Sequence, residues 1–398
     1  AHETADPDCV PLDIFGGPGS MTQEQLDYVS YNAASSAESQ VRDLYGNLSF
    51  DFPGSAEYLP APVGMAIGFE VRNEKFEDQP DALVEQGLSS TNLRRATSGS
   101  ISGREAFVEL DIPMLAGIDF VESLDLNLAA RYTNFDSYDP DLSGKVGIRW
   151  QPFADLLVRA TGSQSFRAPS ITDLFLAATD SYPSVTDPCV GRTEGSTTDQ
   201  NCDAEGVDGG VSQPSSQILT QFGGNQNLEP ETADTFTAGF VFSPSAIPEF
   251  NVYLDYFDIK LDNFIGFLSP QLILDLCYTA DRSSGRPAVC DFVDRNDGGA
   301  GSIRTIQARS FNFAKLETSG IDMAFDYVLP LNEWLGDFLD LPGQFVLSAD
   351  AQYLLSYEQF LPNSDGSFTG YELKGQNLGD TPLPKLKVNT ELTWAMGA

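Results

Sequence analysis

The segment that decides the fold reads Leu157-Val158-Arg159-Ala160-Thr161-Gly162-Ser163-Gln164-Ser165-Phe166-Arg167-Ala168-Pro169. It predicts a β-strand centred near residue 159 that stops close to Pro169, because proline cannot donate a hydrogen bond to a neighbouring strand. A connection rich in Gly, Ser and Asp follows over 167–228. The pattern is therefore a strand that opens into a long loop.

Other parts of the chain alternate between apolar and polar residues, which indicates strands with one apolar and one polar face. Between 63 and 71, for example, every second residue is apolar. We predict about eleven strands from this pattern. Their predicted centres lie near residues 47, 68, 107, 128, 147, 159, 237, 255, 316, 350 and 390.

The sequence also predicts an irregularity in two of these strand regions. The stretch 303–329 reads as two strands if Thr318-Ser319-Gly320 turns the chain. The alternation slips between Tyr256 and Phe257, which predicts a β-bulge there. Helical signal is scarce, although Thr22 and Gln25 predict one capped turn.

The connections between predicted strands alternate between short and long. Long ones lie at 76–100, 167–228, 263–302 and 358–383. Outer-membrane β-barrels have this asymmetry, with aromatic residues at the ends of their strands. A soluble β-sandwich or propeller also has alternating strands, so it stays as an alternative, but we find no propeller-like repeat of about 40–50 residues. Aromatic residues that fit an interfacial belt are Phe50, Phe52, Tyr58, Trp150, Phe153, Phe240, Phe242, Phe250, Trp334, Phe338 and Trp394.

Composition excludes several classes of protein. The 398 residues carry a net charge of −36, and nucleic-acid binding needs clustered Lys and Arg. No apolar run approaches the roughly 18 residues of a transmembrane helix. His2 is the single histidine, which makes catalytic triads and histidine-based zinc sites implausible.

The five cysteines indicate an oxidising compartment. Cys189 and Cys202 have the same spacing as Cys277 and Cys290, and both pairs lie in polar, loop-like sequence without a CxxC motif. We expect two local disulfides, each closing a loop of about 15 residues and worth roughly 3 kcal/mol. Free thiols are the alternative. Cys9 is left without a partner.

Several motifs resemble the barrel of TonB-dependent outer-membrane receptors, in family order. The first is the opening segment, whose residues Phe166, Arg167 and Pro169 match the family's F-R-A-P element. The second is Asn227-Leu228-Glu229-Pro230-Glu231-Thr232, which resembles its N-L-x-P-E-T signature. Val252 to Ile265 is similar to the next strand, and Asn312 to Asp322 to the strand after it. Cys9 to Gly16 is similar to a loop segment of one branch.

This resemblance implies an all-β fold, namely a segment of an antiparallel transmembrane β-barrel with about 11 of about 22 strands. Residues 1–39 would be an extracellular loop segment with Cys9, and 40–398 would be strands and long loops. The family carries an N-terminal plug domain, which we do not find in this chain. We therefore expect a portion of a larger receptor, since an open barrel leaves unpaired edges.

The implied function is TonB-dependent, energy-coupled uptake of a scarce nutrient across the outer membrane of a Gram-negative bacterium. The expected partners are outer-membrane lipid, the missing plug and remaining barrel strands, the TonB complex through that plug, and an extracellular ligand. No nucleic acid, cofactor or metal is implied. A non-transporting extracellular adhesin or structural module is the alternative function.

The long loops supply the candidate ligand-binding residues, and an acidic loop surface disfavours a strongly anionic ligand. We expect Arg167 to form a structural ion pair at the barrel rim and Asn227, Pro230 and Glu231 to belong to the family motif. The acidic pairs Glu109/Asp111 and Asp255/Asp258 do not support a glycosidase, because such pairs arise by chance among 58 acidic residues. Candidate ligand contacts are Tyr182, Phe222, Asn225, Gln226, Tyr278 and Arg282.

Overall fold

The computed structural model describes residues 10–279, 282, 285–296, 298, 300–312, 315–330, 343–362, 368–378 and 381–396. Cys9, His2, Trp334 and Phe338 lie outside the described residues.

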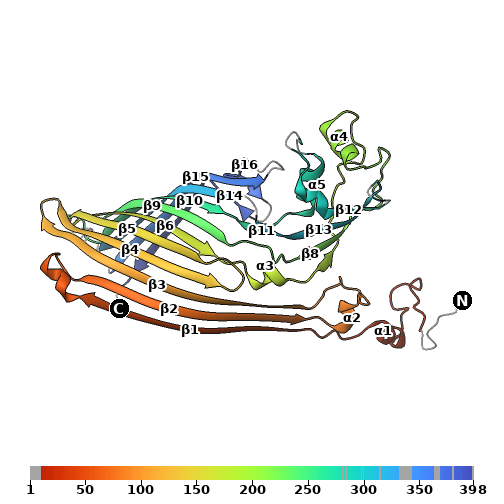
Figure 1. Cartoon of the computed structure of the whole chain (residues 1–398), viewed down its shortest axis with the longest axis horizontal. Helices are drawn as coiled ribbons and strands as arrows, with labels where there is room; N and C mark the ends of the chain where they lie inside the picture. The colour runs from red at the N-terminus through yellow and green to blue at the C-terminus, as the bar shows by residue number, and fades with distance from the viewer. Residues whose placement is uncertain are drawn as a thin grey trace.

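The largest element of the described chain is one twelve-stranded antiparallel sheet (Figure 1). Two of its strands, β16 (Phe368–Glu372) and β19 (Leu386–Ala395), pair with opposite ends of β15, so twelve strands fill eleven positions. The other strands, in order across the sheet, are β1 (Ser36–Phe52), β2 (Val63–Gln79), β3 (Thr97–Ile118), β4 (Val121–Phe135), β5 (Asp141–Phe153), β6 (Leu156–Arg167), β9 (Glu231–Phe242), β10 (Phe250–Asp262), β14 (Lys315–Pro330) and β15 (Gln344–Pro362). Each predicted strand centre falls within one of these eleven positions.

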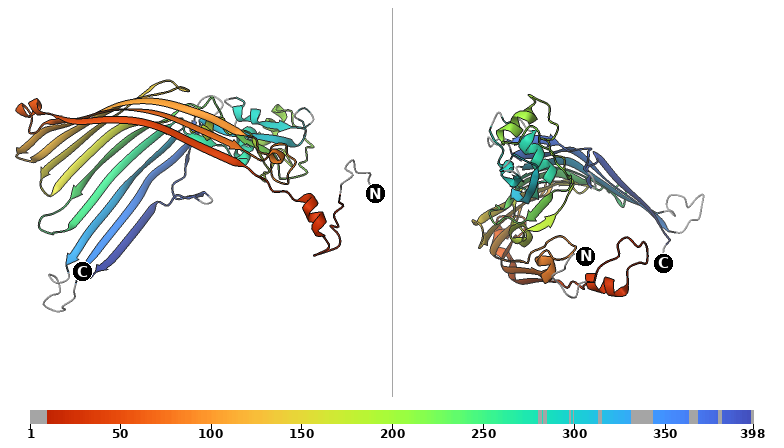
Figure 2. Two further views of the ribbon diagram at one scale, coloured as in Figure 1. Left: turned by 90° about the horizontal axis from the view of Figure 1, so that it is seen from below. Right: turned by 90° about the vertical axis from the view of Figure 1, so that its right-hand side faces the viewer.

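The sheet is a curved wall rather than a closed barrel within the described residues (Figure 2). Each strand of the wall pairs with the wall strand that follows it along the chain. The tight connections between these strands lie at one end of the wall, and the long connections lie at the other end (Figure 1). Phe120 and Glu249 adopt the left-handed conformation in two of the tight turns. The remaining elements are α1 (Gln23–Val29), η1 (Pro53–Glu57), α2 (Ala82–Glu85), α3 (Ile171–Phe175), β7 (Thr179–Ser181), α4 (Thr197–Ala204), β8 (Leu219–Gly223), β11 (Ile265–Phe267), α5 (Pro270–Tyr278), η2 (Ala288–Phe292), β12 (Val293–Arg295), β13 (Ile303–Asn312), β17 (Asn377–Leu378) and β18 (Thr381–Pro382).

The predicted capped turn is confirmed. The backbone N–H of Gln25 donates to Thr22 Oγ1, and the backbone N–H of Thr22 donates to Gln25 Oε1 at 2.9 Å. This capping box begins α1 because it satisfies two N–H groups that have no helical partner. None of the helices in the described part of the chain has the length and apolar character needed to cross a bilayer.

Two details of the strand predictions are wrong. The stretch 303–329 does form two strands, but Thr318-Ser319-Gly320 lies inside β14, where the pairing with β15 shifts between Ser319 and Gly320. The bulge predicted at Tyr256 and Phe257 is absent, because β10 pairs in unbroken register with both neighbours. The two aromatic side chains instead project from opposite faces of β10, as adjacent residues of a strand do.

One face of the sheet carries a continuous band of apolar side chains. Cross-strand pairing aligns Leu48 with Ile67, Ile67 with Val108, and Val108 with Ala130. The band is solvent-exposed in the isolated chain, with Leu48 59% exposed. Aromatic side chains flank it near the tight turns, where Trp150 Nε1 donates to the carbonyl of Phe120 at 3.0 Å. Exposed apolar residues on one face of a sheet suit contact with lipid.

The opposite face, called the polar face below, carries charged pairs that join neighbouring strands. Arg131 on β4 bonds Glu70 on β2 at 2.9 Å and also contacts Glu105 on β3. Arg159 on β6 makes a two-pronged contact with Asp255 on β10, at 3.0 and 2.6 Å. The carboxylates near the sheet centre are thus partly neutralised by arginines on the same face.

Gly239 on β9 makes room for the last of these pairs. It lies between Arg159 and Asp255 in the register, and a Cβ atom there would come within 2.2 Å of Asp255 Oδ1 and 2.3 Å of the Leu254 carbonyl oxygen. Any side chain at position 239 therefore has to push the ion pair and a backbone carbonyl aside.

We expect Gly239→Ala to lower the free energy of unfolding by about 1–3 kcal/mol, the usual cost of overpacking. Unfolding in detergent, followed by heat-modifiable gel migration or denaturant titration, measures this. Gly162→Ala on the adjoining strand β6 is the matched control, because a Cβ there would have no atom within 4 Å. Equal effects of the two substitutions would contradict the assignment.

Candidate functional site

The two longest loops form one folded unit at the loop end of the wall (Figure 1). Their short strands make a five-stranded sheet in the order β11, β13, β8, β7, with β12 paired to β13. β8 comes from the connection after β6, and β13 from the connection after β10. They pair in parallel from Leu219–Thr305 to Gly223–Arg309. The name loop unit is used below for residues 168–230 and 263–312.

The loop unit has its own hydrophobic core. Ile273 and Leu274 of α5 and Ile306 of β13 are fully buried, since α5 packs against β13, and α4 lies against α5 (Figure 1). Side chains from both loops share this core, for example Val207 from the first loop and Ile303 from the second. Neither loop buries this apolar surface alone, so the two stabilise each other.

Both predicted disulfides form within this core. Cys189 is joined to Cys202, and Cys277 to Cys290. All four cysteines are buried, the least buried being Cys290 at 4% exposure. One bond ties α4 to the segment before it, and the other ties α5 to η2. Each restricts the unfolded loop and so favours the folded one.

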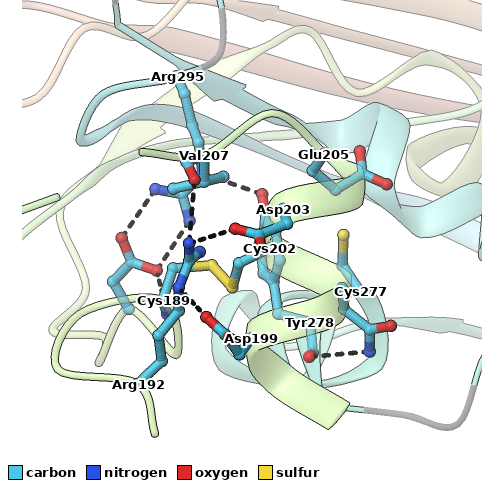
Figure 3. Close-up of a disulfide and its surroundings, with 12 residues drawn as sticks. Cys189, Arg192, Asp199, Cys202, Asp203, Glu205, Val207, Cys277, Tyr278 and Arg295 are labelled. Atoms are coloured by element: carbon cyan, nitrogen blue, oxygen red, sulfur yellow. Dashed lines mark hydrogen bonds and ion pairs between the residues drawn. A yellow bond between two sulfur atoms is a disulfide. The ribbon is translucent and has the colours of Figure 1, made fainter. Parts of the chain in front are cut away.

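A buried ion pair links the two loops (Figure 3). Arg295 donates to both carboxylate oxygens of Asp187, at 2.8 and 2.7 Å, and the two side chains are 3% and 0% exposed. Arg295 Nε donates to Tyr278 Oη at 2.9 Å, and the guanidinium lies 4.8 Å from the centre of the Tyr278 ring. Burial raises the pKa of the Tyr278 phenol, although Arg295 acts in the opposite direction. Three charged or polar groups from distant positions therefore hold one another in place.

A second cluster fixes α4. Arg192 bonds Asp199 at 2.7 Å and Asp203 at 2.5 Å, and also donates to the Val207 carbonyl. Asn201 Nδ2 donates to the Tyr278 carbonyl at 3.0 Å, which connects α4 to the end of α5 (Figure 3). Sequence reasoning missed these residues and the Asp187–Arg295 pair, because their partners depend on how the loops interleave.

Glu205, Cys277 and Cys290 bring potential metal-ligand atoms close together, yet the chemistry does not fit a metal. The two sulfurs are joined in a disulfide, and Glu205 pairs with Arg282 at 2.9 Å and with Arg286 at 2.9 Å. A disulfide sulfur is a poor ligand, and the carboxylate is already neutralised by two guanidinium groups. This cluster is an ion-pair network.

The structure assigns internal roles to several predicted ligand contacts. Tyr278 is 2% exposed and lies in the core, so it cannot contact a ligand on the loop surface. Arg282 donates to the Cys277 carbonyl at 2.6 Å and pairs with Glu205. Asn225 Nδ2 donates to the Ser310 carbonyl at 3.1 Å, and Phe222 packs edge-to-face on Phe267. Of the six candidates, Tyr182 is 47% exposed and Gln226 lines a surface hollow.

The motif residues hold the base of the loop unit. Arg167 contacts Glu231 through two nitrogens, one of them at 2.6 Å, and Glu231 also accepts from the backbone N–H of Ile265 at 2.7 Å. This is an ion pair at the rim, where β6 ends and β9 begins. Phe166 stacks on Phe135, with ring centres 6.2 Å apart. Pro169 is fully buried, and Asn227 and Pro230 lie in the segment that leads into β9.

The hollow beside this base has a volume of about 770 Å³. It lies between the turn 136–140 and the segment 226–232 and is strongly acidic. Burial, together with Asp136 and Asp173, raises the pKa of Tyr138 to about 12, so its phenol stays protonated at neutral pH. The lining includes Asp136, Tyr138, Asp139, Asp141, Phe166, Gln226, Asn227, Glu229, Pro230 and Asn263. The arrangement suits a neutral or cationic polar group better than an anion.

We expect Asp187→Asn to destabilise the loop unit selectively, because breaking a buried ion pair costs roughly 3–5 kcal/mol. Hydrogen exchange of the β8 and β13 amides should quicken by at least roughly 100-fold, while heat-modifiable migration of the wall stays unchanged. Arg304→Gln is the control, since its pair with Asp294 is exposed and worth about 0–1 kcal/mol. Unchanged exchange in Asp187→Asn would show that the pair does not hold the loops.

Comparison with known proteins agrees with this architecture. A mutant of the ferric enterobactin receptor PfeA from Pseudomonas aeruginosa, in complex with enterobactin, is 17% identical with a TM-score of 0.50, over 89% of this chain and 40% of that one. A double mutant of the hemophore receptor HasR from Serratia marcescens, in complex with its hemophore HasA and heme, is 13% identical with a TM-score of 0.51, over 90% of this chain and 48% of that one. These likenesses concern the fold. No curated protein matches the sequence.

The chain spans less than half the length of either solved receptor. The model of the family described as TonB dependent receptor-like, beta-barrel matches residues 12–398. That family consists of Gram-negative outer-membrane receptors, which transport ligands and are not enzymes. Because the match covers nearly all of the sequence, the chain belongs to the TonB-dependent receptor-like β-barrel family.

Proposed function

We propose that this chain is the barrel portion of an outer-membrane receptor that takes up a scarce nutrient with energy supplied through TonB. The observation that carries the proposal is that the same wall has a lipid-compatible apolar band on one face and a disulfide-bonded loop unit at one end. The tight-turn end then faces the periplasm, and the loop unit faces the medium. Residues 1–39 are an extracellular segment that runs into the start of β1, and 40–398 are the strands with their loops.

The partners in this proposal follow from the same arrangement. Outer-membrane lipid covers the apolar band, and an extracellular ligand meets the loop unit. Strands of the remaining barrel pair with the free edges of β1 and β19, because bilayer lipid cannot satisfy open backbone groups. A plug domain lies against the polar face and provides the contact with TonB.

The ligand we propose is polar and not strongly anionic. In the described loops, the arginines at 192, 282, 286, 295 and 304 already pair with carboxylates. The hollow beside Gln226 is lined by Asp136, Asp139, Asp141 and Glu229. An anion would therefore meet repulsion in this hollow, because no Lys or Arg is among the described residues that line it. Neutral or cationic metal chelates are the ligand class that this surface favours.

The test uses the full-length receptor in a Gram-negative strain that lacks its own chelate receptors. We expect radiolabelled uptake of a neutral or cationic ferric chelate, and we expect a protonophore to abolish uptake while surface binding persists. Haem and ferric enterobactin, the ligand types of the two solved receptors, complete the panel of probes. Attachment to surfaces without uptake of any probe would favour the adhesin alternative.

Substitution of the exposed candidates should weaken binding without affecting assembly. We expect Tyr182→Ala and Gln226→Ala to raise the Kd of the bound chelate roughly fivefold or more, as loss of one good contact of about 1 kcal/mol does. Tyr58→Ala is the control, because Tyr58 is 83% exposed but lies at the tight-turn end. A Kd that changes equally in all three variants would reject the loop unit as the recognition surface.

A further inference from the structure

We propose that a basic patch on the apolar face of β1–β3 binds the phosphate groups of anionic lipid headgroups in the leaflet next to the loop unit. The patch consists of Arg42, Lys75 and Arg104 with Asn73 and Ser102 between them. The inference rests on the membrane placement proposed above and adds a specific lipid site to it.

Strand register places these residues on one face. Arg42 of β1 lies opposite Asn73 of β2, and Asn73 lies opposite Ser102 of β3. Asn73 Nδ2 donates to Ser102 Oγ at 2.8 Å, which confirms that the two side chains share a face. Arg104 follows Ser102 by two residues, and Lys75 follows Asn73 by two residues. Because side chains alternate along a strand, all five project to the same side.

This face is the apolar one, and the patch begins where the band ends. Arg104 lies opposite Val71, and Val71 lies opposite Leu44. Val71 is 44% exposed and Leu44 is 65% exposed. Towards the tight turns the face then continues with Phe69, which is 50% exposed. A side chain just above the apolar band lies at headgroup depth, where long Arg and Lys side chains extend towards water.

The two arginines of the patch have charge available for a ligand. Within the described residues, neither Arg42 nor Arg104 forms an ion pair, whereas Arg72 on the polar face of β2 bonds Glu74 at 2.5 Å. Lys75 pairs with Glu77, the next residue of β2 on the same face. Glu77 lies opposite Glu38 of β1, and both glutamates are farther from the apolar band than Lys75 is. Asp136 accepts from the backbone N–H of Ser102 at 3.2 Å and so lies at one edge of the patch, but its contact is to the backbone and neither arginine pairs with it.

Lipid phosphate is the occupant that fits this geometry. A guanidinium binds phosphate oxygens through two parallel hydrogen bonds, and the hydroxyl and amide groups between the arginines add further polar contacts. The adjoining apolar band accommodates the acyl chains of the same lipid. Basic groups beside a membrane-spanning surface are a recurrent mode of anionic-lipid recognition. An anionic lipid therefore matches both the charge and the neighbouring hydrophobic surface.

The experiment uses the full-length receptor in nanodiscs of phosphatidylcholine, alone or with about one-fifth lipid A or phosphatidylglycerol. Native mass spectrometry after release from the disc counts the lipids that remain bound. We expect retention of the anionic lipids over phosphatidylcholine, and we expect Arg42→Gln/Arg104→Gln to reduce that retention by roughly fivefold per arginine removed. Arg42→Lys/Arg104→Lys should fall between the two, because it keeps the charge and loses the paired hydrogen bonds.

Arg72→Gln is the matched control, since it removes an arginine from the polar face of the same strands and should retain lipid as the wild type does. Equal retention in the Gln double variant and the wild type would overturn the inference, and so would equal loss in Arg72→Gln. Retention of anionic lipid that a soluble anionic protein displaces would point to a protein partner instead. A receptor that needs no detergent and enters no nanodisc would overturn the membrane placement itself.

Discussion

The structure depends on one constraint, which is that every backbone N–H and C=O group in a bilayer has to be bonded within the protein. Long antiparallel strands satisfy it by pairing with their neighbours, as β1 to β6, β9, β10, β14 and β15 do, each with the next strand across the wall. Once backbone groups are paired, side chains alternate by necessity. One face is then free to be apolar, and the other can hold the carboxylates of an acidic chain.

The charge of the chain is organised by this division. On the polar face, pairs such as Arg159 with Asp255 place a cation beside an anion, and Gly239 leaves the room that the pair needs. In the loop unit, the Asp187–Arg295 pair is buried and joins two loops. The apolar band lies on the other face of the wall, where the aligned residues Leu48, Ile67, Val108 and Ala130 carry no charge. A net charge of −36 is thus compatible with a membrane protein, because charge avoids the lipid-facing surface.

Sequence reasoning predicted the strands, the two disulfides and the family well, because each rests on a local pattern. Alternation over many residues located all eleven strand positions, and equal cysteine spacing in polar sequence indicated the bonds. It failed where tertiary contacts decide. Tyr278 was expected among the ligand contacts because it is an aromatic residue of a long loop, yet α5 turns it into a core that the other loop completes. Asp187 and Arg295 lie more than 100 residues apart, so no local signal connects them.

The parallel pairing of β8 with β13 has a consequence for how such receptors change over time. Because the two loops share a sheet, a core and a buried charge pair, neither can be replaced alone without leaving its counterpart incomplete. Recombination between related receptors would therefore have to exchange both loops together to yield a folded product. Grafting new loops onto this scaffold faces the same requirement, so under the recognition role proposed for the loop unit the heritable unit of specificity is a pair of loops.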